Sequence, residues 1–174
     1  MKILEIRRHS IRDLGGDHLN QKGIALARKV GQGIGPFDLV ATSTLQRALE
    51  TAVAMGFAVT EQNELMNTYG GAVEREAPWP MPFFHYSEVV KQEGVASQYA
   101  HKLMDYYLEI LERVPQGGSA LVINHGGVVE LGVVACLPDA DFSAWGESVD
   151  YCEGARLFWE DGQFTRGEVL RVQK

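Results

Sequence analysis

Cysteine is scarce in this sequence. The 174 residues include only Cys136 and Cys152, which are too far apart to form a CxxC motif. Two isolated cysteines exclude a small disulfide-stapled fold and do not match the spacing of a structural zinc site. We therefore expect folding through a hydrophobic core, with both cysteines as small apolar side chains in or near it.

Long apolar runs are also missing. No stretch approaches the ~20 consecutive apolar residues of a transmembrane helix. The first residues are strand-like and are not typical of a signal peptide. Positive charge is low, because 16 Lys and Arg stand against 23 Asp and Glu, for a formal net charge of −7. This balance argues against nucleic acid or a membrane as a partner, and we expect a cytoplasmic protein.

Short apolar runs alternate with helical patterns along most of the chain. Strands are predicted at 2–7, 38–41 and 119–124, and helices at 21–30, 45–55, 99–114 and 127–136. Such alternation predicts an α/β fold, a three-layer αβα sandwich around a mostly parallel sheet. Residues 155–160 and 164–172 predict a C-terminal antiparallel hairpin that turns at Asp161-Gly162. We expect a single domain over 1–174.

Two local features complete the predicted fold. Thr42 and Ser43 precede the helix at 45–55 and are candidates for its N-terminal cap. Segment 61–82 has no periodicity and is rich in glycine and proline, which predicts a long loop over the working edge of the sheet.

Two histidines follow predicted strands. His9 comes after the first strand, directly behind Arg8, and His125 follows the strand at 119–124. Arg47 lies in the first turn of a helix, where the helix dipole disfavours a cation, which indicates an external anion. Each histidine alone is more often a structural residue. Because ligands bind at the carboxyl ends of parallel strands, the three together predict one phosphate site.

Three segments resemble the motifs of the histidine phosphatase superfamily, which has the phosphoglycerate mutase-like fold. The family motifs are RHG, SxxxRAxxTA and HGG. They are matched in order by Arg8-His9, the run from Ser43 to Ala52, and His125-Gly126-Gly127. The resemblance covers nearly the whole chain.

The resemblance implies a phosphatase that needs neither a metal nor another cofactor. His9 would attack phosphorus and form a phosphohistidine, while Arg8 and Arg47 would hold the phosphate. His125, as imidazolium, would stabilise the transferring group. Arg7 points to the opposite strand face from Arg8 and is interpreted as structural or exposed.

The leaving group also needs a proton, which many family members supply from a glutamate. Glu64 is the candidate here, although it lies five residues before Tyr69 and related sequences have the acid four residues before the tyrosine. A solvated surface carboxylate is the alternative for Glu64, and Glu74 and Glu76 are weaker candidates. The other branch of the family has an aspartate where this chain has Gly126.

Two residues depart from the family pattern. Ser10 replaces the glycine after the nucleophile, and its hydroxyl would either contact or crowd the phosphate. Arg12 replaces a threonine and would either contact substrate or remain a solvated loop charge. We predict Ser10, Arg12 and the backbone of Gly126 as substrate-binding groups.

The short loop between His9 and Leu19 predicts an open pocket. An open pocket suits a phosphorylated small molecule or a phosphoprotein, including phosphohistidine, as substrate. The alternatives are a non-catalytic module that binds a phosphorylated ligand and, more distantly, a mutase-type phosphotransferase. The sequence makes no prediction of oligomeric state.

Overall fold

A six-stranded sheet forms the centre of the protein, in a computed structural model that describes residues 1–173. The strand order is β3-β2-β4-β1-β5-β6. The first four strands in this order are parallel to one another. Strand β5 is antiparallel to β1, and β6 is antiparallel to β5. The strands are β1 (Lys2–Arg8), β2 (Leu39–Thr42), β3 (Glu61–Gln62), β4 (Ser119–Asn124), β5 (Gly154–Glu160) and β6 (Gln163–Leu170). The predicted α/β class and the C-terminal hairpin are confirmed.

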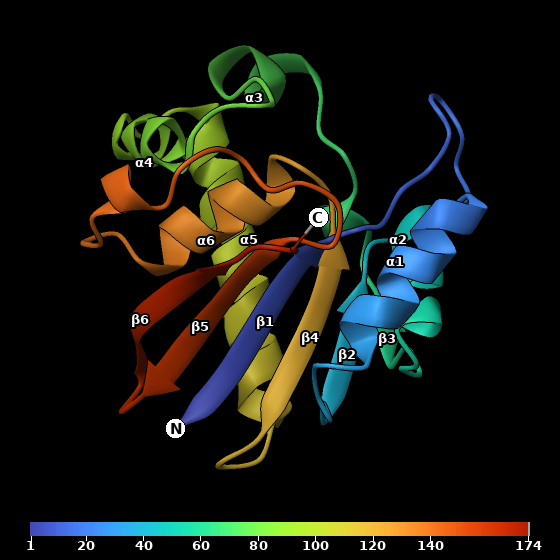
Figure 1. Ribbon diagram of the computed structural model, residues 1–174. Coiled ribbons are helices and arrows are strands. Elements are labelled where there is room, and N and C mark those ends of the chain that lie inside the picture. The colour runs from blue at the N-terminus through green and yellow to red at the C-terminus, as the bar shows by residue number, and fades with distance from the viewer. Residues whose placement is uncertain (174) are drawn as a thin grey trace.

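Helices cover both faces of this sheet (Figure 1). They are α1 (Gln21–Gly31), α2 (Gln46–Ala54), α3 (Gly71–Glu76), α4 (Phe83–Lys91), α5 (Val95–Arg113) and α6 (Val128–Cys136), with short 3-10 helices η1 (Glu64–Met66) and η2 (Phe142–Ala144). One face carries α1 and α2, and the other carries α5 and α6, on which α4 packs (Figure 1). Within residues 1–173, none of these helices combines the length and apolarity needed to cross a membrane.

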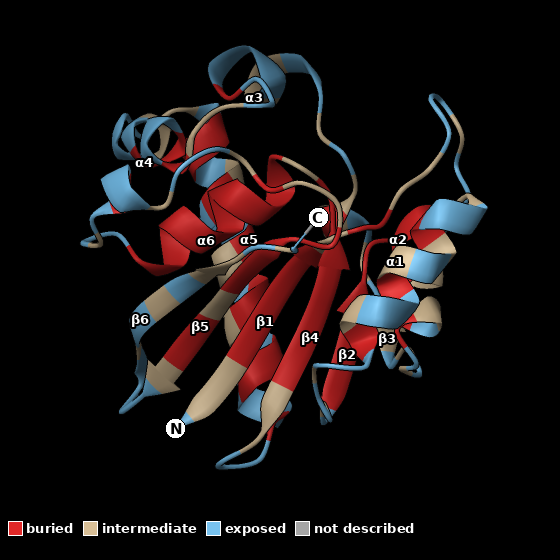
Figure 2. Ribbon diagram, viewed as in Figure 1, coloured by how far each residue is buried: buried red, intermediate tan, exposed pale blue. Residues whose placement is uncertain are grey.

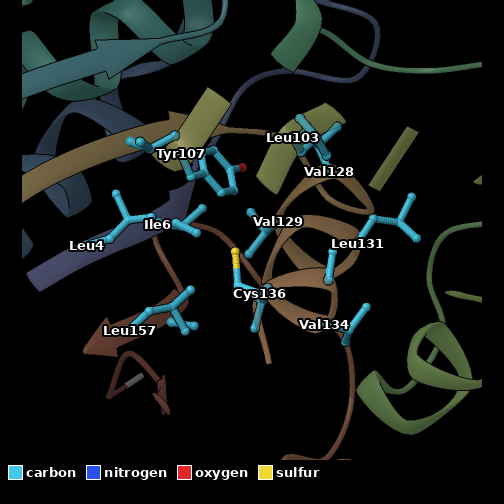
Figure 3. Packing of buried hydrophobic residues seen from close by; sticks show 14 of the residues in the cluster. Leu4, Ile6, Leu103, Tyr107, Val128, Val129, Leu131, Val134, Cys136 and Leu157 are labelled. Atoms are coloured by element: carbon cyan, nitrogen blue, oxygen red, sulfur yellow. The ribbon is translucent and has the colours of Figure 1, made fainter. Parts of the chain in front are cut away.

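Alternating side chains of the central strands build the two cores. Leu4 and Ile6 of β1 pack in the larger core with α5 and α6, where apolar residues interlock closely (Figure 3). Leu121 and Ile123 of β4 face the smaller core beneath α1 and α2. Because both faces of the parallel strands are covered, β1, β2 and β4 are buried along most of their length (Figure 2).

Segment 61–82 differs from the predicted long loop. It contains β3, η1 and α3. Strand β3 is only two residues long, and it forms by backbone pairing with β2, which leaves no periodic signal. Helix α3 has no buried residue, so it needs no apolar stripe. These elements depend on neighbouring backbone rather than on a sequence pattern.

The predicted cap of α2 is wrong. The helix begins after Leu45, which makes no side-chain capping bond. Thr42 belongs to β2, and the Ser43 hydroxyl lies 2.7 Å from a ring nitrogen of His125. By contrast, the Asn20 side chain caps α1 by accepting a hydrogen bond from Gly23 N at 2.9 Å.

A buried carboxylate links β1 to β5. Glu5 is 2% exposed and accepts from Arg7 Nε at 2.6 Å and from Arg156 Nη2 at 3.0 Å. Arg7 also donates to the Cys152 carbonyl at 2.7 Å. Arg7 is therefore a structural residue whose charge is neutralised inside the fold.

We expect Glu5→Ala to lower the free energy of unfolding by about 3–5 kcal/mol, because it leaves the buried Arg7 cation without its carboxylate partner. Urea denaturation measures this loss. Glu168→Ala is the matched control, since its ion pair with Arg156 is exposed and should change stability by less than ~1 kcal/mol. Equal stability of the two variants would contradict the prediction.

Candidate active site

The two histidines are brought together by strand register. Arg8 of β1 lies opposite Asn124 of β4 in parallel pairing, and His9 N donates to the Asn124 carbonyl at 2.9 Å. His9 and His125 are the residues that directly follow β1 and β4. Their ring centroids are 5.2 Å apart, at the carboxyl edge of the sheet where α/β proteins bind ligands.

His9 has one ring nitrogen fixed and the other free to react. Its Nδ1 lies 2.7 Å from the Ser10 carbonyl oxygen, which can only accept, so the proton of the neutral ring is on Nδ1. Burial lowers the pKa of His9 to about 3, and the positive charges of Arg8 and Arg47 lower it as well. The Nε2 lone pair is therefore unprotonated at neutral pH.

His125 is held through its Nε2 atom, whereas His9 is held through Nδ1. Its Nε2 lies 2.7 Å from Ser43 Oγ, and its Nδ1 is buried without a partner. Ser43 Oγ also accepts from Leu45 N at 3.3 Å. Burial and the neighbouring His9 lower the pKa of His125 to about 2. Burial thus favours the neutral ring, and the imidazolium expected during phosphoryl transfer stays a prediction.

Arg8 and Arg47 supply positive charge to the histidine pair. Arg47 Nη1 donates to Asp17 Oδ1 at 3.0 Å. Arg8 Nη1 makes longer contacts, at 3.4 Å to the Val149 carbonyl and 3.6 Å to Asp150. The Nε atoms of both arginines are buried without a partner.

Unpartnered polar atoms concentrate at this one place. Within residues 1–173, the buried side-chain polar atoms that lack a hydrogen bond are Arg8 Nε, Arg47 Nε, His125 Nδ1 and Asn124 Oδ1. Buried polar groups are almost always paired in folded proteins. The two arginine atoms can only donate, and both belong to cations. An anion is the ligand that matches these two donors.

Ser10 is directed away from the predicted role. Its hydroxyl donates to the Gly23 carbonyl of α1 at 2.7 Å, and its backbone N donates to Thr51 Oγ1 of α2 at 2.9 Å. Ser10 therefore joins the two helices, and its hydroxyl proton is committed to α1. The structure gives no support to the expected phosphate contact through this hydroxyl.

Arg12 lies on the loop beside the site. Its Nη1 donates to the Gly16 carbonyl at 2.6 Å, and its charge helps to lower the pKa values of His9 and His125. Arg12 is close enough to act on both rings electrostatically, and its contact with substrate stays a prediction.

Gly126 and Gly127 are required by close packing. A Cβ at Gly126 would lie 2.4 Å from Trp79 Cε2, and one at Gly127 would lie 2.2 Å from the Tyr69 hydroxyl. Gly127 N donates to the buried carboxylate of Glu130 at 2.6 Å, so it is not available to a ligand. Substrate binding by Gly126 N stays a prediction.

Glu64 is exposed at the start of η1. Its segment is tied to the site, because Asn63 N donates to the Thr42 carbonyl at 2.9 Å and Gln62 Nε2 to the Ser43 carbonyl at 3.1 Å. The alternative Glu76 instead accepts from Ala96 N at 2.8 Å at the start of α5. This leaves Glu64 and the exposed Glu74 as the candidate acids of the segment.

Sequence reasoning missed four residues around the site, namely Asp17, Trp79, Glu130 and Tyr151. Glu130 had a signal, since it is a lone acid in the apolar segment Val128–Cys136. The side chains of the other three contact the site arginines from loops, where no periodicity marks them.

Metal ligands do not gather here. Across the part of the chain that the structure describes, no three His, Cys, Asp or Glu side chains form a group placed to hold a metal ion.

The two neutral histidines make stability depend on pH. An unfolded histidine has a pKa near 6.5, so below that pH the unfolded chain binds more protons than the folded one. We expect the free energy of unfolding to fall from pH 6.5 downward by about 1.4 kcal/mol per pH unit for each histidine. The double variant His9→Gln/His125→Gln should show a shallower slope in urea denaturation between pH 7 and 4.5.

The control for this experiment is His85→Gln, which replaces an exposed histidine on α4. It should keep the slope of the unchanged protein. A double variant with that same slope would refute the assignment of both neutral rings.

Comparisons with known proteins agree with this geometry. The family model of the histidine phosphatase superfamily (branch 1) matches residues 7–169. No curated protein sequence matches.

Among solved structures, a phosphoserine phosphatase from Entamoeba histolytica is 17% identical, with a TM-score of 0.69 and coverage of 99% of this chain and 98% of that one. A mycobacterial glucosyl-3-phosphoglycerate phosphatase is 17% identical, with a TM-score of 0.66 and coverage of 99% and 100%. A phosphoglycerate mutase from Thermus thermophilus is 21% identical, with a TM-score of 0.60 and coverage of 98% and 99%. These likenesses confirm the phosphoglycerate mutase-like fold. With the family match over nearly its whole length, the chain belongs to the histidine phosphatase superfamily and, with it, to the phosphoric monoester hydrolases.

Proposed function

We propose that this protein is a metal-independent phosphatase that hydrolyses phosphomonoesters or phosphohistidine through a phosphohistidine intermediate on His9. One observation carries the proposal: the His9 ring lies 5.2 Å from the His125 ring and within electrostatic range of Arg8 and Arg47, each of which has a buried Nε donor without a partner. A phosphate group supplies both the electrophile for the His9 nitrogen and the acceptors for the donors.

The first step transfers the phosphoryl group to the protein. His9 Nε2 attacks phosphorus, an N–P bond forms and the P–O bond to the leaving group breaks. Arg8 and Arg47 neutralise charge on the phosphoryl oxygens, and the Nδ1 proton of His125 adds a hydrogen bond. The dianionic phosphate also favours protonation of His125, which burial alone opposes.

The leaving oxygen takes a proton from the carboxylic acid of Glu64. In the second step the Glu64 carboxylate takes a proton from water, whose oxygen attacks phosphorus. The N–P bond breaks, inorganic phosphate forms, and the nitrogen keeps the bonding electron pair. His9 and Glu64 are then restored.

The substrate is proposed to be a phosphorylated small molecule or a phosphoprotein. Support for the small molecule comes from structural neighbours, one described with 3-phosphoglyceric acid and another as a glucosyl-3-phosphoglycerate phosphatase. A phosphoglycerate mutase among the neighbours keeps phosphotransfer as an alternative. The exposure of Glu64, with no bond that holds its carboxylate at the site, favours the other alternative, a module that binds a phosphorylated ligand without turnover.

His9→Ala should lower the turnover of p-nitrophenyl phosphate in EDTA by roughly 10³-fold or more, because it removes the nucleophile. Rapid acid-free quench of the unchanged enzyme with labelled substrate should trap a base-stable, acid-labile phosphoryl group on His9. Label on a serine or aspartate would refute the mechanism. No turnover of a phosphoester panel from pH 5 to 8, together with a Tm raised by phosphate, would establish the binding module.

Glu64→Gln should slow the hydrolysis of an alkyl phosphate by about 10²–10⁴-fold, because an alkoxide needs a proton to leave. Hydrolysis of p-nitrophenyl phosphate should fall far less, since nitrophenolate leaves without one. Glu112→Gln is the matched control, an exposed carboxylate on α5, and should leave both rates unchanged. Equal losses on the two substrates would remove Glu64 from the role of acid.

A further inference from the structure

The guanidinium of Arg8 lies over two aromatic rings. Its Cζ is 4.5 Å from the ring centroid of Trp79 and 4.2 Å from that of Tyr151. Trp79 comes from the loop between α3 and α4, and Tyr151 from the loop before β5. Two segments that lie far apart in the sequence therefore meet at one arginine.

Aromatic faces hold an arginine differently from a carboxylate. The N–H groups of a guanidinium point outward in its plane, while a ring stacks against its face. Arg47 is held through one of its N–H groups, at 3.0 Å from Asp17. The Nη1 contacts of Arg8 are longer, at 3.4 Å to Val149 O and 3.6 Å to Asp150. Stacking thus orients Arg8 and leaves its buried Nε free for a ligand.

Both rings also lie beside the histidine pair. Tyr151 lies 5.8 Å from the His9 ring, centroid to centroid. Trp79 packs directly on Gly126, next to His125, where a Cβ would lie 2.4 Å from the indole. The two rings therefore set Arg8 relative to both histidines.

We propose that Trp79 and Tyr151 are positioning residues that hold the Arg8 guanidinium by its faces and leave its N–H edge for the phosphate. They act through Arg8 and need no contact with the reacting atoms. This inference rests on the proposed function of the site.

The test measures binding of orthovanadate by calorimetry and kcat and KM for p-nitrophenyl phosphate. Trp79→Leu and Tyr151→Leu, which keep apolar bulk, should each weaken vanadate binding about five- to tenfold, as expected for loss of a partly desolvated cation–π contact. Trp79→Phe and Tyr151→Phe keep the rings and should stay within about twofold of the unchanged protein. Phe84→Leu, at an exposed aromatic of α4, is the control and should have no effect.

A double-mutant cycle separates positioning from a general structural role. In an Arg8→Met background the cation is gone while much of the side-chain length is kept, so Trp79→Leu should cause no further loss of affinity. An equal loss in both backgrounds, or leucine variants that bind like the unchanged protein, would overturn the inference alone. If the unchanged protein neither binds vanadate nor turns over substrate, the proposed function fails and this inference fails with it.

Discussion

The parallel pairing of β1 with β4 is the constraint on which the site depends. It places Arg8 opposite Asn124, so that the residues that follow, His9 and His125, emerge side by side at one edge of the sheet. A slip of one residue would turn every side chain of the strand to the other face. The register is secured because Leu4 and Ile6 fill one core while Leu121 and Ile123 fill the other.

Burial determines the protonation state of the two histidines at the carboxyl edge of the sheet. Desolvation is the largest cause of the low pKa values of both histidines, and the nearby arginines act in the same direction. The fold thus keeps the rings neutral while it concentrates guanidinium charge around them. An arrangement of this kind is costly without a ligand, and a bound anion relieves it. The same packing thus supplies the proposed nucleophile together with the positive charge that attracts a phosphate group.

Particular residues mark how far the sequence alone reaches. Arg8, His9, Arg47 and His125 are predictable because each stands at the end of a strand or in the first turn of a helix, and they meet in the structure as expected. The role of the Ser10 hydroxyl could not be predicted, because the sequence does not show which group it faces. Only the approach of α1 places the Gly23 carbonyl where this hydroxyl can donate to it. Trp79, Tyr151 and Asp17 lie on loops, whose paths do not follow from periodicity.

The sequence by itself determined the fold class, the family and the residues that lie at the carboxyl edge of the sheet. Apolar periodicity determines the strands and helices, and three ordered motifs mark the site. The tertiary structure decided the chemical state of these residues. It decided which nitrogen of His9 carries the proton, that His125 is neutral, and that Arg8 is held by aromatic faces while Arg47 is held by a carboxylate. Such properties depend on burial and on partners from distant segments, and those exist only once the chain has folded.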